Sequence, residues 1–127
     1  MLPCLVNENG GRIAMPASFF SELGNLHDAK IKLVEWDPIQ SKIVLVLDDL
    51  YSNFVGLSEY QGAQPVRLIL SNVSKFKTDV YPDKSPMRII DFEVAEENHD
   101  SEVSVFVNVG PTGFMQITCD AISGCPA

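Results

Sequence analysis

His27 and Asp28 are the adjacent pair in this chain best suited to chemistry, because an imidazole beside a carboxylate can move a proton or help to hold a metal ion. The acids Asp48 and Asp49 follow a strongly apolar run, and metal-binding carboxylates do occur at such strand ends. Together these four residues define one hypothesis, a small metal-dependent hydrolase. We favour structural roles for them, since adjacent strand residues point to opposite faces and paired acids commonly open turns.

Other groups that catalysis or metal binding requires are few. His99 lies in the acidic stretch 96–100, which lacks the ligand spacing and the glycine of a calcium loop and is expected to be a solvated turn. The three cysteines, Cys4, Cys119 and Cys125, show no C-x-x-C spacing, and the chain has neither a nucleophile elbow nor a glycine-rich phosphate loop. We therefore expect a protein that is not an enzyme and that uses no metal and no cofactor.

The C-terminal third of the chain combines negative charge with two phenylalanines. Of the net charge of −8, residues 91–127 contribute −7, because they contain seven acids and no lysine or arginine. If the strands in this region alternate between two faces, one face carries both phenyl rings and several carboxylates. Protein interfaces use aromatic anchors for affinity and complementary charge for selective encounter. The predicted partner-binding residues are Asp91, Glu93, Glu102, Phe106, Phe114, Gln116 and Asp120.

The charge also limits the partners that this face can take. A chain with a net charge of −8 and an isoelectric point near 4.5 repels nucleic-acid backbones and anionic lipid surfaces, and it attracts basic proteins. We expect a basic protein partner, such as a nuclease, and neither nucleic acid nor membrane. The competing explanation of the two phenylalanines is that a second sheet or the helix covers their rings.

Short β-strands and one helix must position these residues. Residues 16–23 predict a helix that begins near Pro16, ends before Gly24 and buries Phe19, Phe20 and Leu23. Strand patterns cover 30–36, 42–47, 66–73, 87–94, 102–109 and 114–122, and hairpins are expected at 95–101 and 110–113. A β-bulge near Leu33–Val34 would keep the first strand in phase. Residues 48–65 are expected to form a long loop, and 74–86 an exposed connection.

Alternation assigns the inward face of the last three strands. The predicted inward residues are Ile90, Phe92, Val94, Val103, Val105, Val107, Val109, Met115, Ile117, Cys119 and Ala121. The fold class that follows is α+β and mostly β: an antiparallel sheet of about six to seven strands, as a sandwich or a partly closed barrel, with one short N-terminal helix. At 127 residues the chain is expected to be a single domain, 1–127. It has no apolar run long enough to span a bilayer and no secretory leader, so we expect it in the cytoplasm.

The run from Phe20 to Ile31, with His27-Asp28-Ala29 at its centre, resembles the apolar-His-Asp-Ala-x-apolar opening of small bacterial β-rich proteins. These include immunity proteins of polymorphic toxin systems and related uncharacterised domains. The same order of elements continues over about residues 19–122. The resemblance implies a non-enzymatic protein that neutralises a toxin by binding it, without a cofactor, and it assigns no catalytic residue. A third hypothesis is a structural domain that forms homodimers by pairing edge strands.

Overall fold

The computed structural model describes residues 12–80, 87–96, 102–110 and 113–127, and these form a mostly β protein with one short α-helix. The predicted class is confirmed, but the sheet has eight strands rather than six or seven. In chain order the elements are α1 (Pro16–Glu22), the 3₁₀ helix η1 (Gly24–Leu26), β1 (Lys30–Asp37), β2 (Lys42–Leu47), the 3₁₀ helix η2 (Ser52–Phe54), β3 (Val66–Ser71), β4 (Lys75–Val80), β5 (Met87–Glu96), β6 (Val103–Gly110), β7 (Gly113–Cys119) and β8 (Ala121–Pro126).

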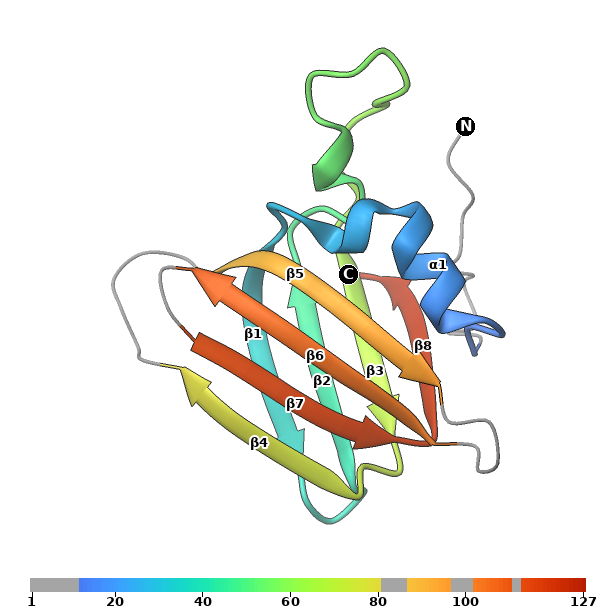
Figure 1. Ribbon diagram of the computed structural model, residues 1–127, viewed down its shortest axis with the longest axis vertical. Coiled ribbons are helices and arrows are strands. Elements are labelled where there is room, and N and C mark those ends of the chain that lie inside the picture. Colours follow the sequence, from blue (N-terminus) through green and yellow to red (C-terminus); the bar gives the residue numbers. More distant parts are fainter. Residues whose placement is uncertain (1–11, 81–86, 97–101, 111–112) are drawn as a thin grey trace.

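All strand pairs are antiparallel, and the strand order is β4-β7-β6-β5-β1-β2-β3-β8. The sheet bends into two layers of four strands that cross one another: a front layer of β4, β7, β6 and β5, and a rear layer of β1, β2, β3 and β8 (Figure 1). The layers are joined where β1 and β5 pair over only two residue pairs, Lys30–Arg88 and Ile31–Met87.

Two additional strands account for the difference in strand number. Residues 75–80, predicted as part of an exposed connection, form β4, which pairs with β7 along its whole length. The predicted strand 114–122 is two strands, because a corner at Asp120 sends the chain from the front layer into the rear layer. The backbone N–H of Asp120 donates to the carbonyl oxygen of Ser71 at this corner. The phase changes there, so Ile122 is buried and Ala121, predicted to point inward, is only half-buried.

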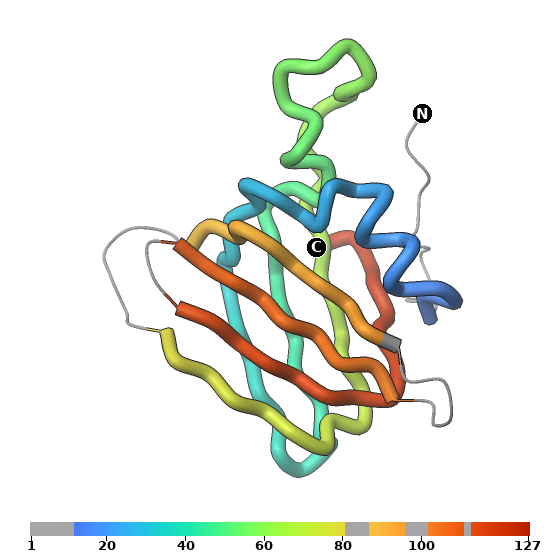
Figure 2. The backbone as a smooth tube through the Cα atoms, viewed as in Figure 1, coloured from blue at the N-terminus to red at the C-terminus, as the bar shows by residue number. Residues whose placement is uncertain are grey.

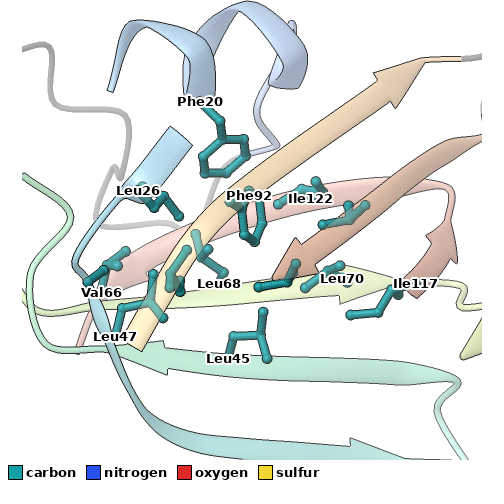
Figure 3. Close-up of a cluster of buried hydrophobic side chains, with 14 of the residues drawn as sticks. Phe20, Leu26, Leu45, Leu47, Val66, Leu68, Leu70, Phe92, Ile117 and Ile122 are labelled. Carbon is teal, nitrogen blue, oxygen red and sulfur yellow. The ribbon is translucent and has the colours of Figure 1, made fainter. Parts of the chain in front are cut away.

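The hydrophobic core lies between the two layers. Leu45, Leu68 and Leu70 of the rear layer face Phe92 and Ile117 of the front layer, and all five side chains are fully buried (Figure 3). The inward prediction is correct for every β6 and β7 residue named in it. Two sheets with alternating apolar residues therefore bury one continuous core.

Two β-bulges change which residues of the strands face inward. In β5 the register shifts between Ile89 and Asp91, so Ile89 takes the core position and Ile90, predicted to point inward, is 43% exposed. In β1 the shift lies between Ile31 and Leu33, earlier than predicted, so Leu33, which alternation places inward together with Ile31, is 45% exposed. A bulge inverts the faces of the residues beyond it, which explains both errors.

Helix α1 packs against β5 at one end of the sandwich. Pro16 occupies its first turn, and Phe19, Phe20 and Leu23 are buried as predicted. The Phe20 ring lies over Phe92 with a centroid separation of 4.8 Å (Figure 3). Gly24 follows at φ +68°, in the left-handed region that a helix end favours.

Residues 48–65 contain η2, and beyond it the segment extends away from the sheet (Figure 2). The acidic loop 97–101 with His99, the hairpin residues 111–112 and Cys4 lie outside the described residues. Among the described residues, no helix combines the length and the apolar character needed to cross a membrane.

Candidate functional site

His27 and Asp28 lie in the connection between η1 and β1, directly before the strand. Asp28 has a positive φ of 72°, and this turns its side chain toward that of its neighbour. The prediction that the two side chains point to opposite faces is therefore wrong: His27 Nε2 lies 3.7 Å from Asp28 Oδ1. Arg88 of β5 donates to the same carboxylate oxygen at 3.0 Å.

Hydrogen bonds from His27 and Asp28 hold this connection against the bulge in β5. Because Ile90 has no direct partner in β6, its carbonyl oxygen accepts a hydrogen bond from His27 Nδ1 at 2.8 Å. The Asp28 backbone N–H donates to the carbonyl of Ile89, and the Ser52 hydroxyl donates to the carbonyl of His27. The His-Asp pair thus holds the connection between η1 and β1 to β5 and to η2, which is a structural use of both residues.

The two acids at the end of β2 are also occupied. Asp48 Oδ1 accepts the backbone N–H of Lys30 at 2.7 Å. Asp49 is 6% exposed; its Oδ1 accepts the N–H groups of Tyr51 and Gln64, and its Oδ2 accepts the hydroxyl of Tyr60 at 2.7 Å. No three His, Cys, Asp or Glu side chains gather into a metal-binding group in the described part of the chain. The hydrolase hypothesis therefore gains no geometric support from these residues.

Five of the seven predicted partner-binding residues lie on the outer side of the front layer, which we call the aromatic face: Asp91, Glu93, Phe106, Phe114 and Gln116. Directly paired residues share a face of the sheet, so side chains line up in rows across four strands. One row contains Glu93, Phe106, Gln116 and Lys77, and the next contains Asp91, Asn108, Phe114 and Asp79. Phe106 and Phe114 lie in adjacent rows and on adjacent strands.

Both rings of the aromatic face are accessible. Phe106 is 38% exposed and Phe114 is 42% exposed, although their neighbours Val105, Val107 and Met115 are buried. Strand alternation is unbroken over β6 and most of β7, so the two phenylalanines point away from the core. Neither α1 nor the rear layer covers them, because the helix packs on β5 and the rear layer lies on the other side of the sheet (Figure 1).

Charge is divided across the aromatic face. Asp91 and Glu93 stand on β5, on one side of the rings, and make no ion pair with any described residue. Glu102 and Asp120 lie at the end of the layer, next to the first pair of β6 with β7, Val103–Cys119. On the other side, β4 contributes Lys75, Lys77 and Asp79, none of which is among the predicted site residues, because the sequence predicts an exposed connection over 74–86. The available signal was the alternation over 75–80, where charged residues alternate with Phe76, Thr78 and Val80.

A groove of about 310 Å³ runs along the border between this face and helix α1. Ser21 and Asn25 line it from the helix side, and Glu93, Ala95 and Phe106 line it from β5 and β6. Sequence reasoning assigned Glu93 and Phe106 to the site but not the two helix-side residues, because only the packing of α1 on β5 brings them near. The groove combines an aromatic surface with a carboxylate and two neutral hydrogen-bonding side chains.

β4 is the outer strand of this layer and bears on the homodimer hypothesis. Lys75 and Lys77 are exposed on it, and lysines are typical of edge strands that are protected against pairing. At the opposite end of the sheet, Arg12 bridges to Ser123, and the N–H of Ile13 donates to the carbonyl of Ile122. A segment of the same chain therefore covers part of the β8 edge.

Comparison with known proteins places the fold and nothing further. No family model matches the chain, and no curated protein does. Among solved structures, an uncharacterised protein from Neisseria gonorrhoeae is similar with a TM-score of 0.54 and 12% sequence identity, over 80% of this chain and 93% of that one. At this identity the likeness concerns the fold alone. The resemblance to immunity proteins stays a prediction.

Proposed function

We propose that this chain is a non-enzymatic, cytoplasmic binding protein whose aromatic face engages a basic protein. The observation that carries the proposal is the exposure of Phe106 and Phe114 side by side on a sheet face bordered by carboxylates that form no ion pair within the described part of the chain. Exposed rings of this size in a small domain are the residues that a partner can bury for affinity. Following the immunity-protein resemblance, the partner class that we infer is a basic toxin.

The groove beside α1 supports this choice of partner chemistry. Glu93 faces Phe106 directly across the β5–β6 pair, and both line the groove. A lysine or arginine side chain in the groove would meet a carboxylate and an aromatic ring together. Such a cation gains both charge-assisted hydrogen bonding and cation–π attraction. We therefore place a basic side chain of the partner here, with Ser21 and Asn25 as further hydrogen-bonding groups.

Affinity capture from the source cells with three immobilised baits tests the proposal. The baits are the wild-type chain, the Phe106→Ser/Phe114→Ser variant, and an Ile39→Ser/Val55→Ser control, which removes two exposed apolar side chains far from the aromatic face in sequence. We expect a basic protein to be retained by the wild type and the control and to be lost from the phenylalanine variant. Two aromatic anchors at an interface correspond to a loss of at least about 30-fold in affinity.

Identical sets of retained proteins on all three baits would contradict the proposal. A Glu93→Lys bait, matched by Glu59→Lys on the exposed loop, separates the contribution of charge from that of the rings. We expect only Glu93→Lys to reduce capture, and most strongly at low salt, because exposed charges are screened as ionic strength rises.

A further inference from the structure

The groove between helix α1 and the aromatic face is small and combines several kinds of recognition group. Its volume of about 310 Å³ lies at the lower end of the range for small-molecule pockets, so it suits one side chain rather than a helix or a strand. Ser21 and Asn25 line it from the helix side, and Glu93 and Phe106 line it where β5 pairs with β6 (Figure 1). The groove therefore offers an aromatic surface, a carboxylate and two neutral hydrogen-bond acceptors to a single group.

The polar side chains of the groove are not engaged elsewhere in the described part of the chain. Ser21, Asn25 and Glu93 make no side-chain hydrogen bond and no ion pair with another described residue. The cation in the same row of the sheet, Lys77, lies three strands from Glu93, which at ordinary strand spacing is about 14 Å. The carboxylate of Glu93 is consequently open to a cation from another molecule.

The direct pairing of Glu93 with Phe106 favours one kind of cation. Their Cβ atoms lie about 5 Å apart on the same face of the sheet. A guanidinium group is planar and weakly hydrated, so its face can lie on a phenyl ring while N–H groups at its edge donate to a carboxylate. An ammonium group is a compact and strongly hydrated charge, which makes contact with an apolar ring more costly. The five donors of a guanidinium group also leave N–H groups for Ser21 and Asn25.

We propose that the groove is a guanidinium site, which takes an arginine of the basic partner in preference to a lysine. Glu93 accepts N–H groups of the guanidinium, the ring of Phe106 covers one of its faces, and the side chains of Ser21 and Asn25 accept N–H groups that remain. The identity of the occupant as part of a protein rests on the proposed function. The preference for a guanidinium over an ammonium group, by contrast, is a property of this chain alone and can be measured without the partner.

Titration of the isotope-labelled full chain with two small probes, followed by NMR, tests this preference. The probes are N-acetyl-arginine methylamide and N-acetyl-lysine methylamide, compared at equal pH and ionic strength. We expect the arginine probe to bind with a Kd on the order of 1 mM, because a single side chain supplies little affinity, and the lysine probe to bind at least about tenfold more weakly. The largest changes in amide chemical shift should fall at Ser21, Glu93 and Phe106.

Two variants assign the binding to the groove. Glu93→Gln removes the charge but keeps the shape of the side chain, and it should weaken the arginine probe at least about fivefold, whereas Glu59→Gln on the exposed loop should leave it unchanged. Asn25 has a φ of 54°, a conformation that glycine adopts without strain. Asn25→Gly therefore removes the amide and preserves the backbone, and it should weaken the arginine probe at least about twofold.

Equal affinities for the two probes would overturn the proposal, and so would shifts spread over the other acids of the chain or an arginine affinity that Glu93→Gln leaves unchanged. The outcome is separable from that of the proposed function. Binding of the arginine probe in the groove, without capture of a basic protein from cells, would support the guanidinium site and contradict the proposed function. Capture of a basic protein through the aromatic face, with no preference for the arginine probe, would do the reverse.

Discussion

At the scale of single residues, Asp49 is a candidate metal ligand by sequence, but in the structure its carboxylate holds a loop together. Its two oxygens accept three hydrogen bonds, two from the backbone and one from Tyr60, and its side chain is almost fully buried. The acceptors connect the start of the 48–65 segment to its end. Both acids therefore have structural hydrogen bonds: Asp48 accepts one from the first residue of β1, and Asp49 accepts three within the 48–65 segment.

Replacing Asp49 with alanine should destabilise the protein by about 2–4 kcal/mol, because hydrogen bonds to a charged group are lost and backbone donors are left without a partner. The free energy of unfolding in urea measures this. Glu59→Ala is the matched control, since Glu59 is an exposed acid in the same segment. Equal stabilities of the two variants would show that Asp49 does not hold the segment together.

The hydroxyl of Tyr60 provides a pH readout of the same contact. The hydrogen bond to Asp49 is the main cause that raises the pKa of Tyr60 above 10.0, with smaller contributions from burial and the nearby negative charges. A raised pKa means that the folded state holds this proton more tightly than the unfolded state. The stabilisation is therefore complete below pH 10.0 and is lost as the pH rises through the folded pKa.

We expect the tyrosinate absorbance of Tyr60, isolated by subtracting the titration of a Tyr60→Phe variant, to appear at higher pH than that of free tyrosine. In Asp49→Asn its midpoint should move down, because the carboxylate that favours the protonated phenol is gone. A midpoint that is the same in both backgrounds would be inconsistent with the contact.

At the scale of elements, helix α1 closes one end of the sandwich through a small aromatic cluster. Phe20 lies 4.8 Å from both Phe19 and Phe92, centroid to centroid, and has no exposed surface. Packing of this kind also holds Ser21 and Asn25 beside the aromatic face, where they line the groove. The stability of α1 and the shape of the groove are therefore linked.

Phe20→Ala should cost about 3–5 kcal/mol of unfolding free energy, which combines the lost burial with a cavity next to Phe92. Ser18→Ala, on the exposed side of the same helix, should change stability by less than about 0.5 kcal/mol. Thermal or urea unfolding compares the two. A small effect of Phe20→Ala would mean that α1 is not docked on β5.

Which face of the sheet a residue lies on can be predicted from the sequence along regular strands, and the prediction fails at bulges and corners. Alternation runs without interruption through β6 and to the end of β7, so the outward position of Phe106 and Phe114 follows directly from the sequence. The prediction from alternation fails at Ile90 and Leu33, because a bulge inserts one extra residue and no residue type in the sequence marks its position. The positive φ of Asp28 is likewise invisible to periodicity, although it brings His27 and Asp28 together.

At the scale of the whole molecule, strand order depends on contacts that are distant in the chain. The sheet places β1 between β5 and β2, and β8 beside β3, so most of the arrangement rests on pairings that no local pattern encodes. The groove arises in the same way, from α1 and β5, which are about 70 residues apart. What the sequence does predict is which side chains of a strand share a face, and the candidate site consists largely of such residues.

At this scale the acids of the C-terminal third and two exposed phenyl rings come together on one layer of the sheet. We propose this combination as the binding surface for a basic partner.

The most direct test of the central claim is hydroxyl-radical footprinting of the chain, alone and in complex with the protein that it captures. Phe106 and Phe114 should be oxidised in the free chain and protected in the complex. Trp36, which is 57% exposed on β1, should be oxidised equally in both states. Protection of Trp36 with continued oxidation of the two phenylalanines would contradict a partner site on the aromatic face.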